Sequence, residues 1–480
     1  MLGSKSIDYF FNPKTIAIIG ASNSKGKVGY TIFENMKKAS SDCNIEASKN
    51  IDEQGNITYK CVEKIFPINP KHKEIQGIKA YPSIKEINQK IDLAVISLPA
   101  KFVPIALEEC ISCKVKAVII VSAGFSEVGE KKLTEKIKKL IDENPKTRVM
   151  GPNCVGVMST YSGVDTTFFE RSRMRTPKQG SLSFISQSGA LGSMILDWVA
   201  TQEFGINKFA SYGNAMDIDE ADLIEHFGED KKTKVITAYL EGARNGRKFF
   251  EIAKKTSLKK PIIVLKGSRN EKTREAAMSH TSSLAGAPKV YDAVFRQAGI
   301  IQAEDLLDLF NIAKLLEKEP LPKGNRVQII TNGGGFGIIT ADQIVEQELE
   351  LAKLSKKSIE KLKNNLPGAI ISNPIDLLGD ATIEDYKKAI ETSLGDKNVD
   401  LIIILVLFNL PTIQVKNILS LKKAREKSTK PIVVCSIGSD YTEKYMHTIE
   451  KAGFCTMNYP SVAAKALKAM VAYSEFLKKN

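Results

Sequence analysis

The chain has 480 residues, of which 43% are hydrophobic and 26% are charged, a composition typical of a globular protein with about three domains. Its net charge is +14, but the Lys and Arg residues are scattered, and no basic stripe is interleaved with aromatic residues. This pattern argues against a nucleic-acid partner, whereas a positive field suits anionic small substrates.

Targeting signals are not evident in the sequence. The N-terminal residues show no apolar stretch before the first charges, and the apolar run 401–407 is too short to span a membrane. The seven cysteines are widely spaced, which is typical of reduced thiols. We therefore expect a cytoplasmic protein without membrane contacts.

Residues 1–150 alternate apolar runs with amphipathic stretches, a pattern that predicts a Rossmann-like domain with a parallel sheet. The polar segment 41–58 is expected to be a surface insertion before the second strand. The expected strands are Thr15–Ile19, Tyr59–Ile68, Leu93–Ser97, Ala117–Val121 and Arg148–Met150.

A glycine-rich loop follows the first expected strand and precedes a helix, an arrangement that brings backbone N–H groups close to a phosphate. The second strand is followed by Lys71, where a nicotinamide site would carry an acidic residue. A cation there suits the extra ribose phosphate of coenzyme A or of an NADP-like ligand. The loop residues predicted to bind the ligand are Gly20, Ala21, Ser22, Lys25 and Gly26.

Polar and small residues also follow the later strands of this domain. Because ligands of open parallel sheets bind beyond the carboxyl ends of the strands, we expect these residues to form a binding rim. They are Ser97, Pro99, Ser122, Ala123, Gly124 and Asn153.

An internal repeat follows. The segment GSLSFISQSGALGSMILDWV from Gly180 aligns with NRVQIITNGGGFGIITADQI from Asn325, and four further segments match in the same order. Each copy begins with a strand, a glycine loop and a helix, which predicts two flavodoxin-like doubly wound domains. We place them at residues 151–320 and 321–480.

The two copies differ where chemistry is expected. Copy one has Glu241 at the end of its middle strand, where copy two has apolar residues, and it adds a loop that contains His280. Ser188 and Gly189 begin a helix whose free N–H groups and dipole suit an anion. Glu241 could orient the imidazole of His280 and make one nitrogen a nucleophile.

These motifs carry a resemblance. GPNCVG, FISQSGALG, YGNAMDID, YLEGARNGRKF, SHTSSLAG and NPIDLLGD occur in this order, and the chain resembles the α subunits of ADP-forming acetyl-CoA synthetases over essentially its whole length. The resemblance implies that His280 is phosphorylated, that Glu241 is its carboxylate partner, and that Ser188, Gly189 and Asn153 bind the phosphate. The family loop usually reads SHTGSLAG, so Ser282 replaces a glycine here.

The resemblance also implies the ligands and the partner. The ligands are CoA or acyl-CoA, phosphate and a small carboxylic acid, and no metal site is expected in this chain. No P-loop or ATP-grasp segment is recognisable, so ADP or ATP with Mg is expected on an ATP-grasp β subunit in an α2β2 complex. The alternatives are a non-catalytic acyl-CoA sensor, a succinate–CoA ligase-like subunit and an NADP-dependent dehydrogenase.

Overall fold

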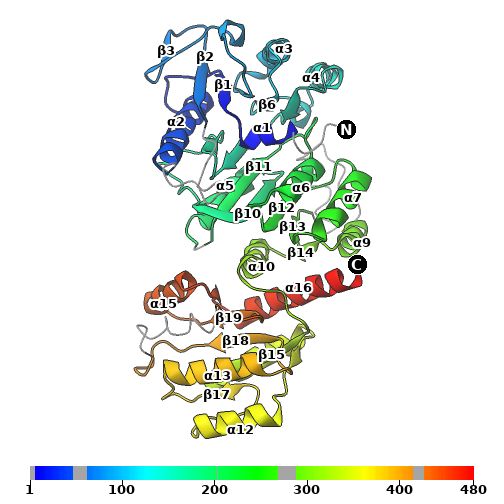
Figure 1. Cartoon of the computed structure of the whole chain (residues 1–480). Coiled ribbons are helices and arrows are strands. Elements are labelled where there is room, and N and C mark those ends of the chain that lie inside the picture. Colours follow the sequence, from blue (N-terminus) through cyan, green and yellow to red (C-terminus); the bar gives the residue numbers. More distant parts are fainter. Residues whose placement is uncertain (1–5, 47–61, 203, 269–287, 414–425, 427) are drawn as a thin grey trace, which may run out of the picture. The chain divides into compact units, whose positions relative to one another are not determined.

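The computed structural model describes residues 6–46, 62–202, 204–268, 288–413, 426 and 428–480 (Figure 1). The chain divides into two compact units, Met1–Gln302 and Ala303–Asn480. Both units are built on largely parallel β-sheets, which confirms the predicted α/β class. No helix within the described ranges is long and apolar enough to cross a membrane.

The first sheet of the N-terminal unit is parallel, with the strand order β2-β1-β5-β6-β7. Its central strands consist of buried Ile, Val, Leu and Ala residues, as expected of a sheet covered on both faces. The strands are β1 (Thr15–Ile19), β2 (Lys64–Ile68), β5 (Leu93–Ile96), β6 (Ala117–Ile120) and β7 (Arg148–Met150). All five predicted strands are present; β2 begins at Lys64 rather than at Tyr59, and residues 59–61 lie outside the described part.

Helices and a small hairpin complete this layer. Helices α2 and α3 contact the sheet, and α4 packs on α3. The elements are α1 (Asp8–Phe11), α2 (Val28–Glu46), α3 (Val103–Ser112), α4 (Lys131–Glu143) and the hairpin β3 (Glu74–Ile75) and β4 (Ile78–Lys79). Most of the predicted insertion 41–58 lies outside the described residues.

The second sheet of this unit has the strand order β14-β13-β12-β10-β11-β8-β9. Its central strands are parallel, whereas β8 and β9 form an antiparallel edge that the sequence did not predict. The strands are β8 (Gly156–Ser159), β9 (Val164–Asp165), β10 (Gln179–Ser186), β11 (Ile206–Ser211), β12 (Val235–Leu240), β13 (Ile262–Lys266) and β14 (Ile301–Ala303). The helices are α5 (Gly189–Val199), α6 (Glu220–Glu229), α7 (Gly246–Ser257) and α9 (Pro288–Ala298).

The C-terminal unit has one parallel sheet, β16-β15-β18-β19-β20, with β17 also paired to β15. Its strands are β15 (Arg326–Thr331), β16 (Glu350–Leu351), β17 (Ile375–Asp376), β18 (Leu401–Leu405), β19 (Ile432–Cys435) and β20 (Cys455–Met457). Its helices are α10 (Leu306–Lys318), α11 (Gly334–Glu346), α12 (Lys356–Asn365), α13 (Ile383–Gly395), α15 (Asp440–Lys451) and α16 (Pro460–Lys479). The pairs β10–α5 and β15–α11 are the repeated strand, glycine loop and helix, so the repeat is confirmed.

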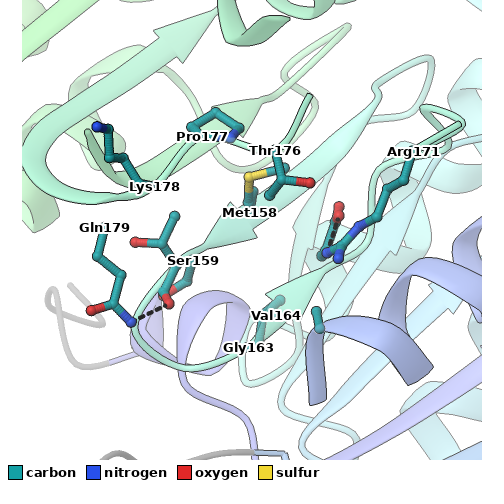
Figure 2. A pocket seen from close by; sticks show the side chains of 12 residues that line it. Met158, Ser159, Gly163, Val164, Arg171, Thr176, Pro177, Lys178 and Gln179 are labelled. Atoms are coloured by element: carbon teal, nitrogen blue, oxygen red, sulfur yellow. Dashed lines mark hydrogen bonds and ion pairs between the residues drawn. The ribbon is translucent and has the colours of Figure 1, made fainter. Parts of the chain in front are cut away.

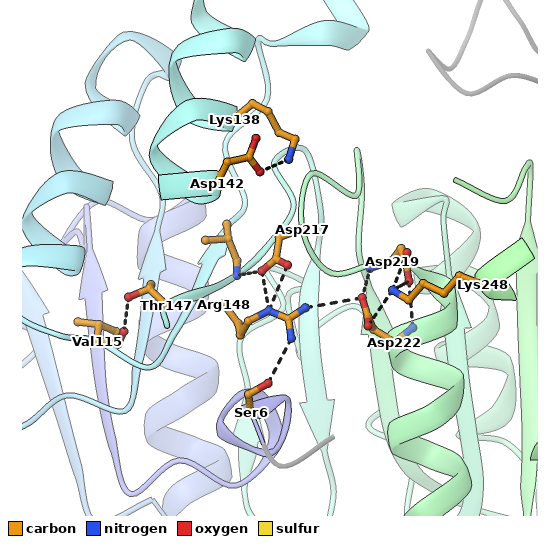
Figure 3. A network of polar contacts seen from close by, with 11 residues as sticks. Ser6, Val115, Lys138, Asp142, Thr147, Arg148, Asp217, Asp219, Asp222 and Lys248 are labelled. Carbon is orange, nitrogen blue, oxygen red and sulfur yellow. Dashed lines mark hydrogen bonds and ion pairs between the residues drawn. The ribbon is translucent and has the colours of Figure 1, made fainter. Parts of the chain in front are cut away.

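A polar network connects the two sheets of the N-terminal unit (Figure 3). Arg148, on β7, donates through Nε to both carboxylate oxygens of Asp217, at 3.1 and 2.9 Å. Asp217 also accepts the backbone N–H of Val149 at 2.7 Å. Asp222 lies 3.7 Å from the same guanidinium and pairs with Lys248 at 2.8 Å. Buried pairs of this kind are costly to break, so the network fixes the two sheets against each other.

Candidate active site

A cavity of about 790 Å³ lies within the N-terminal unit, at the carboxyl ends of strands from both of its sheets. Nine of the residues predicted from the sequence line this cavity. One comes from the predicted glycine loop, four from the predicted binding rim, three from the predicted phosphate site, and the ninth is the predicted carboxylate: Gly20, Ser97, Pro99, Ser122, Ala123, Asn153, Ser188, Gly189 and Glu241. The fold thus gathers segments that lie far apart in the sequence around one space.

The remaining predicted residues lie elsewhere. Lys25, Gly26 and Lys71 are exposed away from the cavity lining, and Gly124 is half-buried behind it. Ala21 and Ser22, within the glycine loop, are buried and do not line the cavity. His280 and Ser282 belong to residues 269–287 and are outside the described residues.

Some lining residues were not predicted. Lys27 provides a cation from the end of the glycine loop, and Phe168 and Phe169 provide an apolar wall. Gln187 directly precedes Ser188 and Gly189, but no role was predicted for it. The position of Lys27 beside the loop glycines was a signal for its role, whereas the two phenylalanines belong to no motif.

The glycine loop is shaped by close backbone contacts. Gly20 has φ +95°, and a Cβ atom there would overlap the carbonyl oxygen of Ser97. A Cβ atom on Gly29 would in turn overlap the carbonyl oxygen of Gly20. Only glycine fits these two positions, so the loop packs closely against the end of β5, and both glycines line the cavity.

The N-terminus of α5 opens into the cavity. Ser188 is the N-cap, and its hydroxyl accepts the N–H of Leu191 at 3.3 Å. Gly189 is packed against Val155, where a side chain would clash. The first N–H groups of a helix have no partner within the helix, and the helix dipole places about half an elementary positive charge at this end. The arrangement suits an anion such as phosphate.

Glu241 lies at the end of β12, on the wall of the same cavity. Its Oε1 accepts a hydrogen bond from the hydroxyl of Tyr239 at 3.4 Å, whereas its Oε2 is buried and has no hydrogen-bond partner among the described residues. Burial and the nearby Glu241 carboxylate raise the pKa of Tyr239 to about 12. A buried carboxylate oxygen without a partner is costly, so Glu241 is set up to accept a donor at the cavity.

The backbone at Glu241 is fixed from two sides. Its N–H donates to Oε1 of Gln187 at 2.7 Å, and its carbonyl accepts from Nζ of Lys266 at 2.7 Å. Burial lowers the pKa of Lys266, while the Glu241 carboxylate opposes that change. The carboxylate therefore projects from a strand end that the half-buried Gln187 and the buried Lys266 hold in place.

Glu220 is a second buried acid of this region, but it does not line the cavity. It is 1% exposed, and its Oε1 accepts the N–H of Arg244 at 2.9 Å. Burial, reinforced by the charge of Asp219, raises the pKa of Glu220 to about 7. In the unfolded chain the same group has its ordinary pKa of 4.5, so the folded protein binds more protons between pH 4.5 and about 7.

This shift predicts how stability depends on pH. Because the folded state holds the extra proton, the free energy of unfolding should fall as the pH rises through that window. Glu220→Gln keeps the acceptor but cannot ionise, so we expect its Tm to fall less than that of the wild type between about pH 5 and pH 8. Thermal unfolding followed by circular dichroism measures this difference. Parallel curves for the two proteins would contradict it.

A smaller cavity of about 390 Å³ lies beside β8 and β9 (Figure 2). It contains none of the predicted site residues. Two of its polar side chains bond to neighbours: Arg171 pairs with Asp165 at 3.0 Å, and Gln179 donates to the carbonyl of Thr160 at 3.1 Å. Of these two cavities, the larger one is therefore the candidate site for the predicted chemistry. Within the described part of the chain, no group of three or more His, Cys, Asp or Glu side chains could hold a metal ion.

Comparisons with known proteins agree with this arrangement. A family model described as a CoA binding domain matches residues 14–160, and one described as a succinyl-CoA ligase-like flavodoxin domain matches residues 179–316. The chain is similar in structure to the dinucleotide-forming acetyl-coenzyme A synthetase 1 of Ca. Korarchaeum cryptofilum, solved with phosphate and ADP. The TM-score is 0.87 and the identity 32%, over 98% of each chain.

Two curated relatives are more similar in sequence. The chain is 40% identical to the α subunit of ADP-forming acetate–CoA ligase II of Pyrococcus furiosus, over 97% of both chains. It is 45% identical to the ADP-forming acetate–CoA ligase of Methanocaldococcus jannaschii, over 79% of this chain but only 50% of that longer protein. The chain therefore belongs to the family of ADP-forming acetate–CoA ligase α subunits.

Proposed function

We propose that this chain is the CoA-binding, histidine-phosphorylated subunit of an ADP-forming acyl-CoA ligase. It would interconvert acyl-CoA, ADP and phosphate with the free acid, ATP and CoA. One observation carries the proposal: a single cavity joins the strand-end rim of the first sheet, the N-terminus of α5 and Glu241, whose Oε2 has no hydrogen-bond partner in the described part of the chain. A binding module without catalysis would not require a buried carboxylate in that position.

The first step takes place where the rim and the helix meet. CoA would lie along the glycine loop and the ends of β5 and β6, with Lys27 near its phosphates. Inorganic phosphate, held by the N–H groups at Ser188 and Gly189, would attack the thioester carbonyl carbon. The C–S bond breaks, the CoA thiolate leaves and an acyl phosphate forms.

The second step transfers the phosphoryl group to His280. Oε2 of Glu241 would accept the N–H of one ring nitrogen and so leave the lone pair of the other nitrogen free. That nitrogen attacks phosphorus, the bond from phosphorus to the acyl oxygen breaks and the carboxylate leaves. The α5 N-terminus stabilises the charge on the phosphoryl oxygens throughout.

The third step needs a nucleotide. The terminal oxygen of ADP would attack the phosphorus of phosphohistidine, which breaks the P–N bond, regenerates the imidazole and forms ATP. Because the sequence shows no recognisable P-loop or ATP-grasp segment, we assign ADP and Mg to an ATP-grasp β subunit, in an α2β2 complex. The Pyrococcus furiosus relative, named as an α subunit, supports the existence of a partner.

Glu241→Gln tests the proposal. The amide retains an oxygen but loses the charge that stabilises a cationic imidazole, so phosphate uptake from acetyl phosphate should slow by on the order of 100-fold. CoA affinity, measured by calorimetry, should not change. Glu220→Gln is the matched control: it makes the same substitution at a buried acid outside the cavity and should leave the uptake rate within about twofold. Equal rates for Glu241→Gln and the wild type would contradict the proposal.

A further inference from the structure

Gln187 joins β10 to the N-terminus of α5 and is bonded to the neighbouring strand end. Its backbone N–H donates to the carbonyl of Tyr239 at 3.1 Å. Its side-chain Oε1 accepts two N–H groups, from Glu241 at 2.7 Å and from Gly242 at 3.2 Å. The backbone bond fixes the chain at Gln187, and the two bonds to Oε1 fix its carboxamide next to the strand end that carries Glu241. Gln187 also lines the cavity.

The second copy of the repeat shows what an amide does at this position when no carboxylate follows. Asn332 aligns with Gln187, and its Oδ1 accepts the N–H of Leu407 at 2.9 Å. Its Nδ2 also donates to the carbonyl of Leu407, at 3.4 Å. Both the oxygen and the nitrogen of the Asn332 amide thus bond to the backbone of the strand end. Leu407 stands there at the position that Glu241 has in the first copy.

The side-chain amide of Gln187 bonds to its strand end in a different way from that of Asn332. Both of its side-chain bonds to the described residues use Oε1, and Nε2 donates to none of these residues. Because Oε1 is bonded to the strand end, Nε2 of the same planar amide remains available as a donor to a ligand in the cavity. Ser188, Gly189 and Glu241 line that cavity beside it.

We propose that Gln187 is a positioning residue for Glu241 and, through Nε2, a hydrogen-bond donor to the phosphoryl group being transferred. The inference rests on the proposed function and adds a group to its site. It has a physical reason: the α5 dipole contributes about half a positive charge, against a phosphoryl group that carries nearly two negative charges. A neutral donor adds stabilisation without pairing with the Glu241 carboxylate, as a Lys or Arg would.

Two substitutions separate the two roles. Gln187→Glu keeps an oxygen that accepts both N–H groups but replaces the donor with a second acceptor. Phosphate uptake from acetyl phosphate should slow by about 100-fold or more, while the KM for acetyl phosphate changes less. Gln187→Met removes both roles. It should slow uptake as well, and it should also increase hydrogen exchange at the N–H groups of Glu241 and Gly242, which Gln187→Glu should leave protected.

Asn373→Asp is the matched control. Asn373 is a half-buried amide of the C-terminal unit, with Oδ1 accepting from Ile329 at 3.1 Å and Nδ2 donating to Val327 at 2.7 Å. The amide-to-acid change should lower Tm there but leave phosphate uptake within about twofold. If Gln187 had only a structural role, Gln187→Glu would likewise lower Tm and leave phosphate uptake within about twofold.

The outcomes are distinct. Uptake by Gln187→Glu within twofold of the wild type would overturn the donor role. Unchanged exchange at residues 241 and 242 in Gln187→Met would overturn the positioning role. If the wild-type chain took up no phosphate, the proposed function and the donor role would fail together, and the exchange experiment would still decide the positioning role.

Discussion

His280→Ala should abolish the uptake of acid-labile phosphate from acetyl phosphate. Removal of a nucleophile leaves no atom to form the P–N bond, and such losses exceed about a thousandfold in enzymes that use covalent intermediates. CoA binding should survive, because the glycine loop and the strand ends that would bind it belong to other segments of the chain. Labelling with radioactive acetyl phosphate, followed by acid treatment, measures the effect, and calorimetry with CoA measures the binding.

His447→Ala controls for loss of an imidazole in general. His447 lies on α15 of the C-terminal unit and outside the cavity lining, so its removal should leave labelling unchanged. His226 is less suitable as a control because its ring is buried and stacks on Phe11 at 5.4 Å, so its loss would disturb the core. Undiminished labelling of His280→Ala would show that another residue carries the phosphate.

The chain alone should make no ATP from acetyl-CoA, phosphate and ADP, although it should accept phosphate from an acyl phosphate. Phosphohistidine can return its phosphoryl group only to an acceptor held in line with the P–N bond, and this sequence has no motif that would hold ADP. Addition of an ATP-grasp subunit should start synthesis and form a stable complex. A luciferase assay detects ATP, and light scattering gives the mass of the complex. Robust ATP formation by the purified chain alone would reveal a nucleotide site within it.

The parallel sheets were predictable because their strands are continuous apolar runs. The interpretation of Leu93–Ser97 and Ala117–Val121 as buried strands is confirmed by β5 and β6, whose residues are buried throughout. The repeat was predictable for a related reason: two copies of one pattern identify each other even where either alone is ambiguous.

The residues that line the cavity were less predictable, because contacts between segments far apart in the sequence determine which side chains reach it. Within the glycine loop, the sequence favoured Lys25, but Nδ2 of Asn69 donates to the carbonyl of Ala21 at 2.9 Å and holds the loop so that Lys27 lines the cavity. Similarly, Asn35 on α2 donates to the carbonyl of Phe169 at 2.9 Å. Neither contact leaves a periodic signal in the sequence.

The salt bridge between Arg148 and Asp217 bears on how such a protein could be divided or recombined. A fragment that ended after the first sheet would contain the guanidinium of Arg148 without its counterion. A fragment that began with the second sheet would contain Asp217 without its arginine partner. Each fragment would be destabilised by a charge that has lost its partner. The two sheets of the N-terminal unit are therefore expected to be inherited, exchanged and engineered together. Gene fusions and circular permutations should be tolerated only where they leave this pair intact.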